Sequence, residues 1–388
     1  MSKNRERLWV PEIGVEAPAK KSHVHVEMSM GSLAGYIEIE LIDAATGVVK
    51  EYYSFPNMIL TAGLDGLMSG NGGARMNSML DTLTIGTGST AVLPTDLSLD
   101  EEVERTTNDG GILDVKGYVT GTGGGPFDLG NPYHFVKKTR VFVENEANFP
   151  TLSELGLRGV GSPEFQFTRA LIRDVTGSLT TIEKTDQDQL RVTYEIRGFP
   201  PTSQITGTFV MADSGVTHSF TSSGEDIDRA HEGTGNGANN GRAWTFGFNA
   251  QSGPDPRGFF FELGNFGGGG SAGIKAYASA SAPQNPTGTV AEWTGWTLGT
   301  GITVSQSNEP AYVSGTLFRS NKATWEPSAA NFASGGIEGF NFKFTGNTNG
   351  EHIMAMYITP SIKKTDLDRL VLTYNVAVTA SLTFPSGS

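Results

Sequence analysis

The chain has 388 residues, no cysteine, and a net charge of −13 that results from 28 basic and 41 acidic side chains. The lack of cysteine excludes disulfides, thiolate metal sites and cysteine nucleophiles. The acidic balance repels phosphate backbones, so we expect no nucleic-acid partner. No apolar run approaches the ~20 residues of a membrane span, so we expect no membrane insertion. The 51 glycines, together with short runs rich in Val, Ile and aromatic residues, predict an all-β protein.

Residues 1–22 hold two prolines and a mixed-charge start and show no periodicity. They indicate an extended N-terminal arm, which either pairs with a neighbouring subunit or is a frayed terminus. Because no apolar segment follows the charged start, we expect no Sec signal peptide.

A hairpin is predicted next, since residues 35–42 alternate apolar and acidic side chains. Residues 45–47 form its turn, and residues 48–55 form the return strand, which should end at Pro56. Thr61 then caps a short helix. The apolar face of that helix consists of Leu60, Leu64, Leu67 and Met68.

Further strands are predicted at residues 83–85, 136–143 and 165–172. The first runs into Gly86-Thr87-Gly88, which is not followed by Gly-Lys-Ser/Thr and therefore indicates a glycine turn and not a phosphate loop. We expect residues 190–197 to be the return strand of residues 165–172.

Residues 202–350 are richer in glycine and aromatic residues and poorer in charge. Three tryptophans in this stretch are candidates for stacking on sugar rings, although aromatic side chains more often fill a β-sandwich core. These candidate glycan contacts are Trp244, Trp293 and Trp296.

A segment of fourteen residues, 181–194, recurs 180 residues later with eight identities, as residues 361–374. Both copies read Lys-Thr-Asp-x-Asp followed by an alternating strand, so we predict the same hairpin in each half of the chain. Ala147-Asn148-Phe149 and Ala330-Asn331-Phe332 are a weaker echo. The repeated hairpin residues are Lys184, Thr185, Asp186 and Asp188, and Lys364, Thr365, Asp366 and Asp368.

A repeat at this distance has the length of a domain and not of a solenoid unit. We therefore expect an extended arm over residues 1–22 and two tandem β-sandwiches, jelly-roll or immunoglobulin-like, over residues 23–200 and 201–388. The paired aspartates of each hairpin suit either calcium or a solvated turn. The turn is the simpler interpretation, because the calcium-loop spacing is missing.

No catalytic, cofactor or metal site can be assigned from the sequence. His23 and His25 share a strand face but have no identifiable third ligand. His231-Glu232 lacks the second histidine of a zinc-protease helix. Ser271 lies in a Gly-x-Ser-x-Gly run without the strand and helix of a nucleophile elbow.

Several blocks of the first half together resemble virion structural proteins of tailed bacteriophages. One set is a hairpin over residues 35–55, a segment containing Ala-Gly-Leu over residues 57–65, and a strand that ends in Gly-Thr-Gly over residues 83–88. A second set is residues 167–174 followed by residues 190–197.

The resemblance implies a non-enzymatic protein of the tail, neck, collar or fibre-attachment region, made in the host bacterial cytoplasm and located in the virion. Its expected partners are other virion proteins and further copies of itself in a ring or trimer. The alternative is an adhesin whose second domain binds a host-surface glycan. A glycan depolymerase is a third hypothesis, although no pair of carboxylates can be brought together from the sequence.

Overall fold

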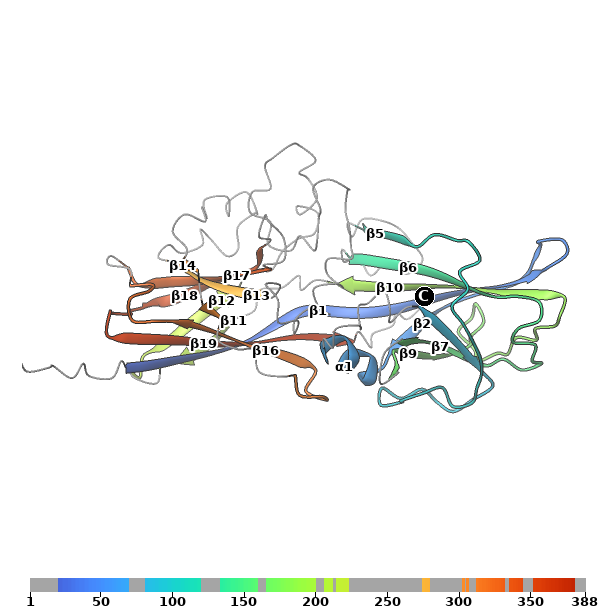
Figure 1. The fold of residues 1–388 in the computed structure, drawn as a ribbon. Helices are drawn as coiled ribbons and strands as arrows, with labels where there is room; N and C mark the ends of the chain where they lie inside the picture. Colours follow the sequence, from blue (N-terminus) through green and yellow to red (C-terminus); the bar gives the residue numbers. More distant parts are fainter. Residues whose placement is uncertain are drawn as a thin grey trace, which may run out of the picture.

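The computed structural model describes residues 20–69, 81–119, 133–159, 165–199, 206–211, 214–222, 274–279, 302–303, 305–306, 312–331, 335–344 and 352–380. The protein is all-β, as predicted, and its strands build sandwich-like layers. One helix, α1 (Thr61–Ser69), occurs in the described part of the chain. The molecule is elongated, and strand β1 (Lys20–Asp43) runs through most of its length (Figure 1).

Strand β1 belongs to both halves of the molecule. Residues 32–43 pair antiparallel with β10 (Asp188–Phe199), and residues 35–42 pair on the other side with β2 (Val49–Ile59). Residues 20–33 pair parallel with β19 (Asp368–Ala380). One strand thus joins two sandwiches. The predicted domain boundaries at residues 22/23 and 200/201 stay a prediction.

The first sandwich has one layer in which β1 lies between β2 and β10, and β10 continues to β6 (Tyr133–Phe142) and β5 (Val115–Val119). Strand β2 then passes to the second layer, where it pairs with β9 (Thr168–Leu171). The remaining strands of that layer are β7 (Glu154–Gly159), β3 (Thr82–Gly86), β4 (Glu102–Thr106) and β8 (Phe165–Gln166).

The second sandwich places β15 (Ser305–Gln306), β16 (Phe318–Trp325), β19 and the first part of β1 in one layer. Trp325 of this layer stacks on Phe340 of the other, with ring centroids 5.3 Å apart, and both side chains are fully buried. The six strands of that other layer, in sheet order, are β11 (Thr206–Val210), β12 (Thr217–Ser222), β18 (His352–Ile362), β17 (Ile337–Phe344), β13 (Ile274–Ser279) and β14 (Ile302–Thr303).

The predicted first hairpin and the helix beginning at Thr61 are confirmed. Two details were wrong. Pro56 does not end the return strand, because it pairs with Tyr36 inside β2 and the strand continues to Ile59. Strand β10 is not the return strand of residues 165–172: its hydrogen-bonded neighbours are β1 and β6.

Candidate functional site

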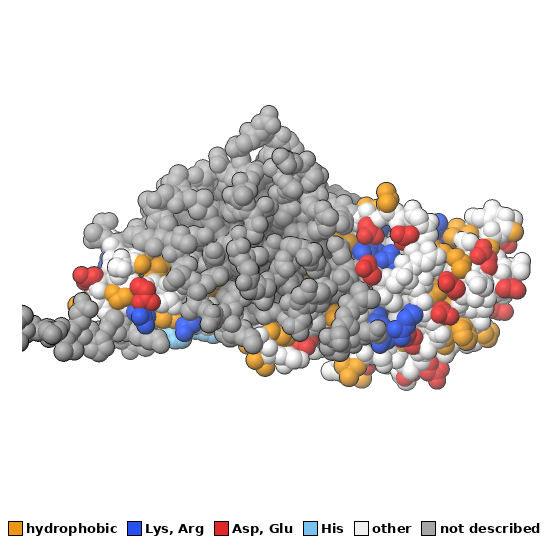
Figure 2. Space-filling view, in the orientation of Figure 1, with side chains coloured by type: hydrophobic (Ala, Val, Ile, Leu, Met, Phe, Trp, Pro, Cys, Tyr) orange, Lys and Arg blue, Asp and Glu red, His pale blue; other side chains and the backbone are white. Residues whose placement is uncertain are grey.

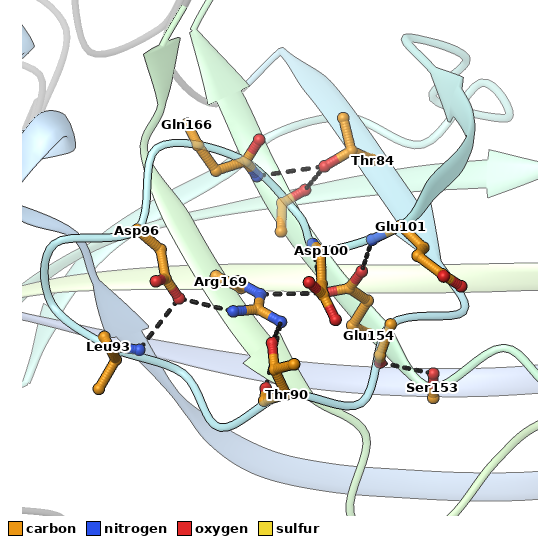
Figure 3. A network of polar contacts seen from close by, with 12 residues as sticks. Thr84, Thr90, Leu93, Asp96, Asp100, Glu101, Ser153, Glu154, Gln166 and Arg169 are labelled. Carbon is orange, nitrogen blue, oxygen red and sulfur yellow. Dashed lines mark hydrogen bonds and ion pairs between the residues drawn. The ribbon is translucent and has the colours of Figure 1, made fainter.

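A buried ion pair lies at the centre of the first sandwich's second layer (Figure 3). Arg169 of β9 donates from Nε to Glu154 Oε2 at 2.8 Å and from a terminal nitrogen to Asp96 Oδ2 at 2.6 Å. Its other terminal nitrogen reaches the carbonyl and hydroxyl oxygens of Thr90, both at 3.2 Å. The Arg169 and Glu154 side chains are 3% and 0% exposed, so the pair is desolvated.

Glu154 also binds the backbone of the loop between β3 and β4. Its carboxylate accepts hydrogen bonds from the amides of Asp100 at 3.1 Å and Glu101 at 2.7 Å. Ser153 Oγ donates to the carbonyl oxygen of Gly88 at 2.7 Å, and the Asp96 carboxylate accepts from the amide of Leu93 at 3.0 Å. One arginine and two carboxylates therefore fix residues 87–101 to the sheet.

The glycines of Gly86-Thr87-Gly88 are explained by this carboxylate. A Cβ atom on Gly88 would lie 2.4 Å from Glu154 Oε1 and 2.4 Å from Asp100 Cβ. A Cβ on Gly86 would lie 2.4 Å from the carbonyl oxygen of Glu101. The turn is therefore glycine-rich because the chain approaches a protein carboxylate.

Helix α1 packs on the same layer through another glycine. A Cβ on Gly63 would lie 2.4 Å from the carbonyl oxygen of Phe167, which accepts a hydrogen bond from the amide of Leu60 at 3.0 Å. The amide of Thr61 donates to the carbonyl oxygen of Pro94 at 2.8 Å, in the loop that Arg169 holds. Three of the blocks that carry the resemblance thus meet at one place in the fold.

The electrostatics of this network favour the charged form of Arg169. Burial alone would lower the pKa of Arg169, but hydrogen bonds from the guanidinium to Asp96 and Glu154 outweigh burial and raise the pKa. The Glu154 oxygens face three donors, which are the Arg169 guanidinium and the amides of Asp100 and Glu101. This arrangement anchors the loop between β3 and β4, and the Glu154 carboxylate is bound by donors of the protein itself.

A second kind of polar site occurs twice, at the repeated turns. Lys184 Nζ donates to the carbonyl oxygen of Val143 at 2.9 Å and to Asn148 Oδ1 at 2.8 Å. Lys364 Nζ donates to the carbonyl oxygens of Glu326 and Pro327 at 2.9 and 3.1 Å, and to Asn331 Oδ1 at 2.8 Å. Burial lowers the pKa of each lysine, against the opposing effect of nearby carboxylates.

The aspartates close the turns in the same way in both copies. Asp188 Oδ2 accepts from the amide and hydroxyl of Thr185 at 3.0 and 2.7 Å. Asp368 Oδ2 accepts from the amide and hydroxyl of Thr365 at 2.9 and 2.7 Å. Burial raises the pKa of Asp188, but hydrogen bonds from Lys50 and Thr185 outweigh it, so the pKa is lowered overall.

The eight predicted hairpin residues thus fall into two matching turns, with Asp186 and Asp366 exposed. The turns lie at opposite ends of β1, because Asp188 is in register with Asp43 and Asp368 with Lys20. The three tryptophans proposed as glycan contacts, Trp244, Trp293 and Trp296, lie outside the described residues.

His23 and His25 are exposed on β1, where they contact the side chains of Thr373 and Asn375 of β19 at 2.7 and 3.3 Å. Within the described ranges, no group of three or more potential metal ligands comes together, and no helix has the length and apolarity that crossing a membrane requires.

Sequence reasoning missed Glu154, Asp96 and the role of Arg169. The only signal was indirect: the Gly-Thr-Gly turn needed a close neighbour, and the sequence does not say which. Comparisons with known proteins provide no guide, since no family model, curated protein or solved structure matches this chain.

Proposed function

We propose that the chain is a non-enzymatic structural protein of a tailed-bacteriophage virion, located in the tail, neck or fibre-attachment region. It assembles as a symmetric homo-oligomer and contacts other virion proteins. The proposal begins from the resemblance described above, which concerns about residues 30–200.

The observation that supports it is the convergence of that resemblance on one structural device. Residues 57–65, 83–88 and 167–174 are far apart in the chain, yet they pack around the Arg169–Glu154 pair. A buried ion pair is weak evidence for stability, and one attested use of such groups is to specify a unique conformation. A loop that is held rigidly in one conformation suits a virion component that must fit against other virion proteins in fixed positions.

The long strand β1 is a second supporting feature. Its 24 residues would extend for about 80 Å at ~3.3 Å per residue, with a sandwich on each end and a matching lysine-centred turn beyond each. Such a rod can hold two neighbouring components at a set distance.

The test is the composition and structure of purified phage particles from a host that carries this gene. We expect peptides of the chain in the particle by mass spectrometry, and its density at the tail, neck or fibre base by cryo-electron microscopy. Particles that contain no copy of the chain would exclude the proposal. Binding of the full chain on a host-glycan array would favour the adhesin alternative instead, and release of reducing sugar would favour the depolymerase.

A further inference from the structure

Three polar atoms in the core of the first sandwich have no hydrogen-bond partner among the described residues. They are both atoms of the Asn57 side-chain amide and the hydroxyl oxygen of Tyr194. Asn57 and Tyr194 are each only 2% exposed. Charged side chains are spread over the visible surface of this sandwich (Figure 2), whereas these three atoms lie in its interior. Because buried polar groups are nearly always hydrogen-bonded, the three atoms call for a partner that is not a protein group.

Gly35 of β1 brings these atoms to one place. It lies directly opposite Asn57 in the β1–β2 pair, and Tyr194 lies opposite Ile37, two residues further along β1, in the β1–β10 pair. A Cβ atom on Gly35 would lie 2.8 Å from Tyr194 Oη and 3.5 Å from Asn57 Nδ2. The phenol therefore reaches over the glycine toward the amide. One small molecule between the two side chains can hydrogen-bond to both.

The surroundings of the phenol favour a small and neutral ligand. Burial raises the pKa of Tyr194, and the nearby uncharged hydroxyl of Thr168 opposes this effect, so the phenol stays neutral. An ion taken into such a place would need an opposite charge beside it. Water has no such need, and its two donors and its acceptor oxygen match an amide and a phenol.

We propose that an internal water molecule bridges Tyr194 Oη and the Asn57 amide beside Gly35. Internal waters typically make about three hydrogen bonds to buried polar groups, and the phenol and the amide supply three such atoms. The bridge lies where β2 crosses between the layers, since the next residue, Met58, is in register with Arg169 of β9. The water thus joins β1, β2 and β10 at the crossing.

A dry site would respond differently to mutation. Polar atoms that are buried without partners destabilise a fold, and replacing them by apolar groups of the same shape is then neutral or stabilising. With a bridging water, the same replacement deprives the water and the remaining side chain of a partner, so it destabilises. The two states therefore predict different signs for one substitution.

Thermal melts of the full chain with Tyr194→Phe, Asn57→Leu and the double variant test the bridge. We expect each single change to lower the melting temperature by several degrees. Because both changes remove contacts of the same water, the double variant should lose less than the sum of the two single losses. Tyr52→Phe is the control: Tyr52 is 49% exposed on β2, and its replacement should leave the melting temperature unchanged.

A crystal structure of the wild-type chain that shows ordered waters is the direct measurement. We expect density for one molecule within hydrogen-bonding distance of Tyr194 Oη and the Asn57 amide. Absence of that density, single variants at least as stable as the wild type, or additive losses in the double variant would each overturn the bridge. Neither measurement depends on the virion proposal, because both concern the interior of a single copy.

Discussion

At the scale of single residues, the protein buries a carboxylate and surrounds it with hydrogen-bond donors. Glu154 is 0% exposed, and its carboxylate receives the Arg169 guanidinium and two backbone amides. Removing one partner of such a pair leaves the other charge buried and uncompensated, and this is far more costly than the pair itself is favourable.

The first prediction concerns the arginine. Arg169→Met leaves Glu154 and Asp96 without their cation, and we expect the free energy of unfolding to fall by about 3–5 kcal/mol. The control is Arg105→Met, since Arg105 is 47% exposed and pairs with Glu102 on the surface at 2.7 Å; there we expect a loss of no more than about 1 kcal/mol. Urea unfolding followed by circular dichroism measures both, and equal losses would contradict the role assigned to the network.

The second prediction concerns the glycine nearest the carboxylate. Gly88→Ala puts a Cβ where Asp100 Cβ, Glu154 Oε1 and the Glu101 amide already lie, all within 2.9 Å. Because part of that contact is backbone, we expect a loss of about 2–3 kcal/mol. Gly47→Ala is the control: its φ of +72° is costly for alanine, but nothing lies within 4 Å, so about 1–2 kcal/mol is expected. A Gly88 variant no less stable than the Gly47 variant in thermal melts would contradict the steric argument.

At the scale of elements, the repeated hairpin shows how a local sequence builds the same structure in two settings. In each copy, the ammonium of the buried lysine hydrogen-bonds to the loop that precedes the turn. The strand after the turn then pairs with the strand that comes before that loop. Leu190 is in register with Phe142, and Leu370 with Trp325. Ala147 and Ala330 both adopt a left-handed conformation, with φ of 50° and 57°, in the loop that each lysine binds.

The third prediction uses this equivalence. Lys184→Met and Lys364→Met each remove a buried ammonium that donates to three backbone carbonyls and an asparagine oxygen, so we expect similar losses of about 2–4 kcal/mol. Lys363→Met is the matched control, because Lys363 is the exposed neighbour of Lys364, and a change of about 0.5 kcal/mol is expected there. Local hydrogen exchange at each turn distinguishes the two sites. A strong effect at one lysine alone would show that the two turns are not energetically equivalent.

At the scale of the whole molecule, local patterns predicted the elements but not their partners. Alternation over residues 35–42 gave the first hairpin, and the leucines beside Thr61 gave the helix. Alternation over residues 23–30 also indicates a strand, but it does not identify the partner, because β19 lies about 350 residues further along the chain. The Glu154 network likewise joins residues separated by 15 to 79 positions, and no spacing rule covers such contacts.

One contact between the two sandwiches is also invisible in the sequence. Asp65 of α1 accepts hydrogen bonds from Tyr312 at 2.6 Å and Ser314 at 2.7 Å, and from the amide of Gly315. Burial raises the pKa of Asp65, but these three donors outweigh burial and lower it below 3.8. Burial and the Asp65 charge raise the pKa of Tyr312 to about 12. The carboxylate therefore joins the helix of one sandwich to a loop beside the other.

The fourth prediction follows from the sign of the Asp65 shift. A carboxyl whose pKa is lower in the folded protein stabilises it fully above the unfolded value of 3.8, and this contribution is lost as the pH falls through the folded pKa. We therefore expect the amides of residues 312–317 to be protected from hydrogen exchange at pH 7. Below about pH 3 they should lose protection, after correction for intrinsic rates. Asp65→Asn should remove the protection at both pH values. Asp174→Asn, in a turn of the first sandwich, should leave it unchanged. Equal protection of residues 312–317 in the wild type and Asp65→Asn would contradict the role assigned to the Asp65 carboxylate.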